Sequence, residues 1–122
     1  MAVFDSELVS RFEWLRHINH GDLATPPLLM VFDLLQLEEK DYRPEPLKVR
    51  RKALEKLVRG QKLILPTRRL SPNGLAAWTE VLHCGYEGMV AKDPESPYVG
   101  GRTLKWLKVK VRNYRVKERG WE

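Results

Sequence analysis

The stretch Thr103-Leu-Lys-Trp-Leu-Lys-Val-Lys-Val-Arg112 alternates between two kinds of side chain. Alternate residues of a β-strand share one face and lie roughly 6.6 Å apart. One face of a strand here carries Leu104, Trp106, Lys108, Lys110 and Arg112. The other carries Thr103, Lys105, Leu107, Val109 and Val111, so we expect this mostly apolar face to pack on a core. Lys108 and Lys110 then suit successive phosphate oxygens, although lysines also protect edge strands from aggregation.

Other segments of the chain predict the rest of the fold. Residues 28–35, Leu-Leu-Met-Val-Phe-Asp-Leu-Leu, are nearly all apolar, and they are too short for a stable helix. They predict a strand that is buried on both faces. The remaining expected elements are helices over 7–19, 46–59 and 71–84 and strands over 2–5, 61–66 and 87–92. This order predicts an α+β fold of antiparallel sheets flanked by helices, with paired C-terminal strands.

The third expected helix has clear boundary signals. Ser71 is suited to be its N-cap, Pro72 to be its first helical residue, and Gly85 ends it. Helical spacing predicts that four apolar side chains face inward: Leu75, Trp78, Val81 and Leu82.

Length and composition limit the class of protein. The chain has 122 residues, of which 43% are hydrophobic and 31% charged, as expected for one globular domain. Its longest apolar run is far shorter than the ~20 residues of a membrane-spanning helix. A single cysteine, Cys84, cannot form an internal disulfide, so we expect a reducing, cytoplasmic setting.

The net charge of +6 is concentrated at one end of the chain. Basic and acidic residues balance over 1–100, whereas residues 101–122 contain eight Lys and Arg against two Glu. Such a concentration is typical of a surface that binds a polyanion, such as DNA, RNA or a nucleotide phosphate. A solvated basic tail is the alternative.

Two further positions are candidates for chemistry. Glu87, followed by Gly88 at a strand start, could hold a divalent cation, or it could simply be exposed after a helix end. Phe32 could stack on a nucleobase, or it could belong to the core. His17 and His20 are three residues apart, and no third metal ligand is evident near them.

Taken together, these segments resemble the nucleotidyltransferase core of ATP-dependent DNA ligases, especially the bacterial end-joining type. Residues 31–35 (Val-Phe-Asp-Leu-Leu) are similar to motif IIIa of that family, and residues 43–51 to the segment that follows it. Residues 87–92 (Glu-Gly-Met-Val-Ala-Lys) and the loop after them resemble motif IV. Residues 106–110 (Trp-Leu-Lys-Val-Lys) resemble motif V.

The resemblance implies an activity and roles for individual residues. The family uses ATP and Mg²⁺ to link a lysine to AMP, transfers AMP to a 5′-phosphate, and seals the nick. Phe32 matches the aromatic residue that packs on adenine, and Glu87 the acid that helps to hold the metal. Lys108 and Lys110 match the lysines that neutralise phosphate charge. Weaker candidates are Lys92 for the nucleotide, and Tyr98, Arg102 and Arg112 for DNA.

The chain also departs from the family pattern. The nucleophilic lysine of the family sits in Lys-x-Asp-Gly, and these 122 residues contain no Asp-Gly dipeptide. We therefore expect residues 1–111 to be a partial adenylation domain without its catalytic nucleophile, completed by an upstream polypeptide. Residues 112–122 would be a basic tail or the start of a linker to an oligonucleotide-binding domain. The alternatives are a non-catalytic DNA-binding remnant and an RNA ligase or capping-type nucleotidyltransferase.

Overall fold

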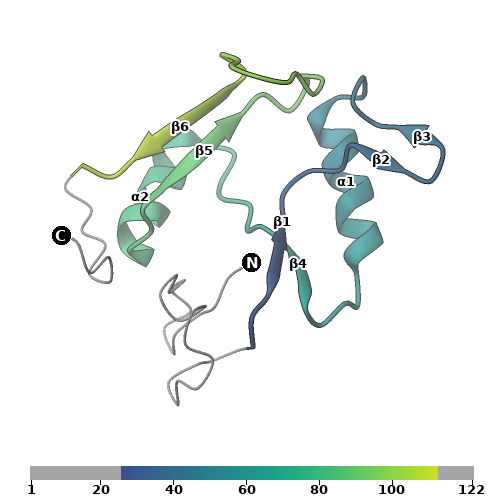
Figure 1. Ribbon diagram of the computed structural model, residues 1–122. Helices are drawn as coiled ribbons and strands as arrows, with labels where there is room; N and C mark the ends of the chain where they lie inside the picture. Colours follow the sequence, from purple (N-terminus) through teal and green to yellow (C-terminus); the bar gives the residue numbers. More distant parts are fainter. Residues whose placement is uncertain (1–25, 113–122) are drawn as a thin grey trace, which may run out of the picture.

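The computed structural model describes residues 26–112. Within them lie two helices and three pairs of short strands (Figure 1). The elements are β1 (Leu29–Val31), β2 (Gln36–Leu37), β3 (Lys40–Asp41), α1 (Leu47–Val58), β4 (Ile64–Pro66), α2 (Gly74–Cys84), β5 (Gly88–Lys92) and β6 (Trp106–Lys110). The expected elements at 2–5 and 7–19, the histidine pair, and residues 113–122 of the tail lie outside the described part of the chain.

The three strand pairs are small and separate. The β5–β6 pair is antiparallel, as expected. The antiparallel β2–β3 hairpin was not predicted, and β1 and β4 pair in parallel across the connecting helix α1. The mixed α+β class is confirmed, and the β1–β4 pair is its one parallel feature within residues 26–112. In Figure 1, α2 lies behind β5 and β6, and α1 stands beside β2 and β4.

The core lies between α1 and the strands next to it. Leu34, Leu54 and Val58 form a buried cluster, and partly buried side chains of β1, β2 and β4 pack around it. Leu54 and Val58 are four residues apart, so they lie on the same face of α1. Burial of each such side chain stabilises the fold by roughly 1.5–3 kcal/mol.

The strand predicted over 28–35 is much shorter than expected and is not buried on both faces. Only residues 29–31 form a strand, and Phe32 is 51% exposed. The strand ends at Val31, and two residues later the carboxylate of Asp33 accepts a hydrogen bond from the Leu34 backbone N–H and pairs with Arg50. A long-range ion pair therefore overrides the local strand pattern.

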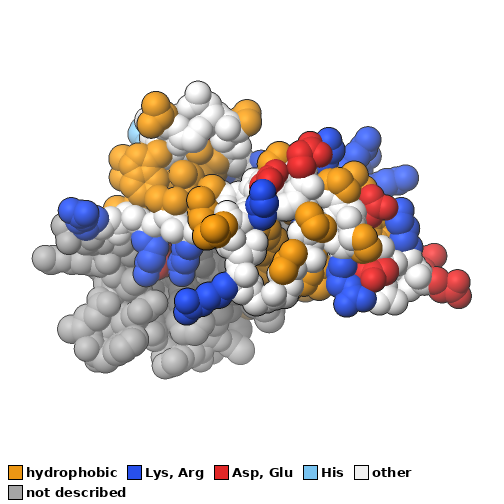
Figure 2. Space-filling view, turned by 90° about the horizontal axis from the view of Figure 1, so that it is seen from above, with side chains coloured by type: hydrophobic (Ala, Val, Ile, Leu, Met, Phe, Trp, Pro, Cys, Tyr) orange, Lys and Arg blue, Asp and Glu red, His pale blue; other side chains and the backbone are white. Residues whose placement is uncertain are grey.

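Helix α2 begins later than predicted and buries a narrower face. Asn73, not Ser71, is the N-cap, because its side chain accepts a hydrogen bond from the Ala76 N–H. Ala77 and Val81 are buried against the sheet, whereas Leu75 and Leu82, which were expected to face inward, are 82% and 54% exposed. Figure 2, which is seen from above, shows apolar side chains gathered over the part of the surface that includes α2.

The face of β6 that was expected to be core is also partly open. Leu107 is 51% exposed and Val109 is 36% exposed. The alternation of the strand was predicted correctly, but alternation does not say how much of a face is covered. No described helix is long and apolar enough to cross a membrane.

Candidate functional site

The paired strands β5 and β6 place several candidate residues on one face. Lys92 lies opposite Trp106, Val90 opposite Lys108, and Gly88 opposite Lys110. Directly opposed residues of an antiparallel pair project from the same face of the sheet. The register therefore confirms that Trp106, Lys108 and Lys110 share a face, and it adds Lys92 to them.

One end of this face is aromatic. The Lys92 ammonium lies 4.1 Å from the centroid of the Trp106 ring and 4.9 Å from that of Phe32. The Phe32 and Trp106 rings meet edge to face, with centroids 6.5 Å apart. Tyr98 also meets Trp106 edge to face, with ring centroids 6.2 Å apart. We call Phe32, Lys92 and Trp106 the aromatic corner.

Lys92 is half-buried, and its surroundings change its acidity. Burial lowers the pKa of Lys92 from the ordinary lysine value, and the nearby carboxylate of Asp33 offsets this only in part. Arg51 and Arg50 lower the pKa further through charge repulsion. Contact of the ammonium with two aromatic faces is an attractive arrangement for a partly desolvated cation.

The other end of the face is charged and exposed. The Lys110 ammonium lies 3.2 Å from a carboxylate oxygen of Glu87, and both side chains are open to solvent. Lys108 is exposed between the two ends. We call Glu87, Lys108 and Lys110 the charged end. Glu87 has the opposite strand parity to Lys92, but it lies just before β5, and its carboxylate contacts Lys110 there.

Gly88 allows the backbones of β5 and β6 to approach each other closely at the charged end. A Cβ atom at Gly88 would clash with the backbone oxygen of Val109 and lie 2.9 Å from the Cα of Lys110. Only a residue without a side chain allows β6 to approach this closely. Gly88 thereby places the Glu87 carboxylate beside Lys110.

Glu87 is an isolated carboxylate. Within residues 26–112, no three Asp, Glu, His or Cys side chains gather into a group able to hold a metal ion. Mg²⁺ commonly uses only one or two protein carboxylates and takes its other ligands from water and substrate phosphates. Glu87 therefore suits a shared metal site, and it does not suit a site built by these residues alone.

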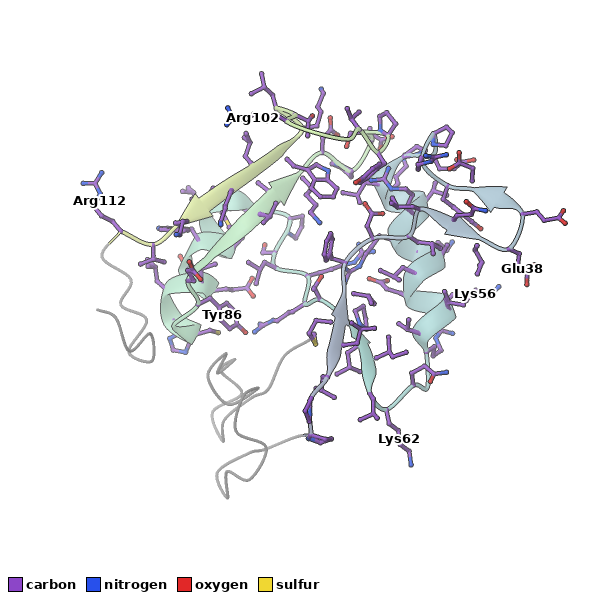
Figure 3. All side chains as sticks on the ribbon, in the orientation of Figure 1. Glu38, Lys56, Lys62, Tyr86, Arg102 and Arg112 are labelled. Carbon is purple, nitrogen blue, oxygen red and sulfur yellow. The ribbon has the colours of Figure 1, made fainter. Side chains whose placement is uncertain are left out.

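The weaker DNA candidates do not gather at one point. Arg102 and Arg112 lie beyond opposite ends of β6 (Figure 3). Tyr98 lines an open groove of about 460 Å³ that β3 shares with the loop between β5 and β6. The groove is lined by Asp41, Arg43, Pro44, Pro97, Tyr98 and Gly100.

Two important residues were not recognised as site residues from sequence. Asp33 was only the one charged residue in the apolar segment 28–35, and Arg50 lay in the segment 43–51 that follows the motif IIIa resemblance. The structure joins them in a buried ion pair, with Arg50 Nε 2.9 Å from Asp33 Oδ1. A charge within an apolar run was the available signal, because such a charge is rarely buried without a partner.

The fold and the β5–β6 face define a partial nucleotidyltransferase domain. Residues 2–110 match the ATP dependent DNA ligase domain family, and the chain belongs to this family. The sequence is 36% identical to DNA ligase 1 of Korarchaeum cryptofilum over 110 residues, which cover 87% of this chain and 20% of that protein. It is 37% identical to a probable DNA ligase of Mycobacterium sp. strain KMS over 92 residues, which cover 71% of this chain and 17% of that protein.

Solved structures agree with this assignment. The ligase domain of M. tuberculosis LigD superposes with a TM-score of 0.71 at 31% identity, covering 89% of this chain and 35% of that one. A mycobacterial DNA ligase D complexed with ATP and MES gives a TM-score of 0.73, also at 31% identity and the same coverage. This chain thus spans about one-fifth of the sequence relatives and about one-third of these ligase chains.

Proposed function

We propose that this chain forms one wall of the nucleotide site of an ATP-dependent DNA ligase that seals nicks through an enzyme–AMP intermediate. The observation that carries the proposal is the β5–β6 face, on which an aromatic corner and a charged end lie in line. A purine nucleotide has the same two parts, a flat base and a chain of charged phosphates. Membership of the ligase family and the likeness to a ligase complexed with ATP support this interpretation.

In this proposal the aromatic corner receives adenine. Phe32 is 51% exposed although it is aromatic, so its ring is available for stacking. Stacking of a base on an aromatic side chain is worth about 1–3 kcal/mol. Lys92 lies against Phe32 and Trp106 and keeps a positive charge beside the nucleotide.

The charged end receives the phosphates. Lys108 and Lys110 supply positive charge where negative charge increases during transfer of the adenylyl group. Glu87 would be one ligand of Mg²⁺ there, and the ion would neutralise phosphate charge when bound. Since Glu87 already contacts Lys110, metal and phosphate would replace that ion pair.

The DNA substrate in this proposal is a nicked duplex. Tyr98, Arg102 and Arg112 are proposed contacts, and the basic residues of 101–122 provide a general attraction to the phosphate backbone. Each phosphate contact contributes about −0.9 to the slope of log K against log salt for duplex DNA. Removing residues 112–122, which carry four Arg and Lys, should flatten that slope in a filter-binding titration. A slope unchanged by the deletion would place the DNA surface elsewhere.

A nucleophile must come from outside the 122 residues, because they contain no Lys-x-Asp-Gly. We infer that residues 1–111 act with an upstream polypeptide that carries this motif, and that they do so in the cytoplasm, where a lone Cys84 stays reduced.

Labelling with radioactive ATP tests the proposal. With Mg²⁺ present, the chain alone should form no covalent AMP adduct that survives denaturing gel electrophoresis. A chain completed with a segment bearing Lys-x-Asp-Gly should form one. Failure of the completed, folded chain would favour the non-catalytic DNA-binding remnant. Labelling by GTP in preference to ATP would favour a capping-type enzyme.

A further inference from the structure

Arg50 is the most completely buried charged side chain among the described residues, and the proposed reaction does not use it directly. It is 0% exposed. Its Nε and Nη2 donate to the two carboxylate oxygens of Asp33, at 2.9 and 3.1 Å. Its Nη1 donates to the backbone oxygens of Glu45 at 2.7 Å and Ser96 at 3.0 Å. One side chain therefore ties three separate segments together.

The loop between β5 and β6 is fastened to α1 by a second set of contacts. Pro46, the N-cap of α1, provides no side-chain cap. The first backbone N–H groups of the helix have no partner within it, and this loop supplies their acceptors. Leu47 N donates to Ser96 O and Lys48 N to Pro94 O, both at 2.9 Å. Ser96 is itself 3% exposed. The loop thus replaces the usual cap and is held where Arg50 also binds it.

These contacts bear directly on the aromatic corner. Phe32 comes from the segment after β1, whereas Lys92 and Trp106 come from the β5–β6 pair. No strand pairing within residues 26–112 joins those two sheets. Arg50 joins them instead, because it holds Asp33, the neighbour of Phe32, and also the loop that runs from Lys92 towards Trp106.

We propose that the buried Asp33–Arg50 pair is a positioning device that holds the Phe32 ring against Lys92 and Trp106, so that the seat for the purine base is formed before the nucleotide binds. This rests on the proposed function for the identity of the ligand. The planar guanidinium fork fixes direction as well as distance, which a lysine cannot do. Apolar replacements of buried ion pairs are often as stable, so a role in geometry accounts for a charge here better than stability alone.

Asp33→Asn tests the proposal with little change of volume. The amide keeps an oxygen for the Leu34 N–H, but it turns an NH₂ group towards Arg50 Nη2, where two donors then meet. Asp41→Asn is a matched control. Asp41 accepts two similar bonds from Arg43, at 2.9 and 2.8 Å, yet this pair is exposed and no contact of it with the aromatic corner occurs among the described residues.

Two measurements on the full chain report separately on the geometry of the aromatic corner and on the binding of ATP. In NMR spectra, the methylene protons next to the Lys92 ammonium should be shifted upfield by the Trp106 and Phe32 rings. In folded Asp33→Asn, this shift should largely disappear, and ATP should bind about five- to tenfold more weakly, the lower part of the cost of losing one stacked base. Asp41→Asn should change neither the shift nor the affinity.

The alternative results are distinct. Wild-type Lys92 shifts and wild-type ATP affinity in folded Asp33→Asn would overturn the positioning role. A collapsed shift with unchanged ATP affinity would show that the pair sets the aromatic corner but that the corner does not bind the base, and this would overturn its role in forming the base site. If the wild-type chain binds no ATP, the proposed function fails, while the Lys92 shift still decides whether the pair sets the corner.

A second variant covers the case in which Asp33→Asn does not fold. Arg50→Lys keeps a positive charge for Asp33 but cannot also reach the backbone oxygens of Glu45 and Ser96. It should therefore loosen the loop and lose the Lys92 shift even though the ion pair remains. A folded Arg50→Lys chain with the full wild-type shift would contradict the proposal.

Discussion

The two ends of the β5–β6 face are organised by different forces. At the aromatic corner, Lys92 is half-buried between two rings, and the loop beside it is bound to α1. At the charged end, Lys110 and Glu87 form an ion pair whose side chains are 57% and 44% exposed. Exposed pairs of this kind contribute only about 0.2–1 kcal/mol.

This difference indicates which part of the site is formed before a ligand binds. The aromatic corner is held by packing and buried hydrogen bonds, so a ligand meets it already assembled. The charged end is held only by an exposed ion pair. Breaking this pair, so that Lys110 binds a phosphate and Glu87 a metal ion, costs little free energy. Substitutions at the charged end should therefore affect chemistry, whereas those at the aromatic corner should affect binding.

The largest effect is expected from the lysines of the charged end. In a chain completed with the Lys-x-Asp-Gly segment, Lys108→Ala and Lys110→Ala should each slow AMP-adduct formation by about 10²–10³, because each removes charge aimed at the transferring group. Lys105→Ala is the control. Lys105 has the opposite strand parity and pairs with Asp93 at 3.5 Å. Equal damage from Lys105→Ala would show that the assignment of the face is wrong.

Glu87→Ala should separate metal-dependent chemistry from simple charge. Adduct formation with Mg²⁺ should fall by about 10² or more, a scale typical of losing one charge-stabilising group. Binding of ATP without Mg²⁺ should instead become tighter, because Lys110 loses its carboxylate partner and repulsion of the phosphates decreases. Quench-flow labelling and calorimetry measure the two quantities. Weaker binding without Mg²⁺ would contradict this role of Glu87.

Phe32→Ala should weaken ATP binding to the 122-residue chain by about 5- to 150-fold, as expected for the loss of one base stack. Phe32→Tyr keeps the ring and should bind ATP within about twofold of wild type, since a phenol ring stacks as well. Calorimetry checks both variants. An unchanged ATP affinity in Phe32→Ala would show that the base does not bind at the aromatic corner.

The smallest effect concerns pH. Because burial lowers the pKa of Lys92 in the folded chain, the unfolded chain binds more protons between that lowered pKa and the ordinary lysine value of 10.5. The free energy of unfolding should therefore rise with pH across this alkaline window, relative to Lys92→Met, which has no such proton. Urea unfolding at several pH values measures the difference. A difference that falls with rising pH would reverse the inferred direction.

Local patterns predicted the parts of the fold that depend on local chemistry. Helix α1, expected over 46–59, is observed over Leu47–Val58, and the register of Trp106, Lys108 and Lys110 follows from the period of a strand. The early end of β1 was not predictable in this way. It depends on Asp33 meeting Arg50, which is 17 residues away, and no periodic pattern encodes that contact.

The candidate site shows the same limit. Phe32, Glu87, Lys108 and Lys110 were recognised from their segments and from family resemblance, and their roles remain proposals. The contact of Lys92 with Trp106 arises from the cross-strand register, which the sequence alone did not specify. Exposure of Leu107 and Val109 was missed because periodicity identifies a face but not what covers it.

Titration of the 122-residue chain with ATP, followed by two-dimensional NMR, tests the central claim most directly. The account predicts that the largest shifts occur at Phe32, at Lys92 and Trp106, and along β6 to Lys110. Residues on the exposed side of α1, such as Lys56, should stay unchanged, which also controls for unspecific attraction of ATP to lysine. Shifts confined to α1, or no saturable shifts at the aromatic corner, would contradict the assignment of this face as the nucleotide site.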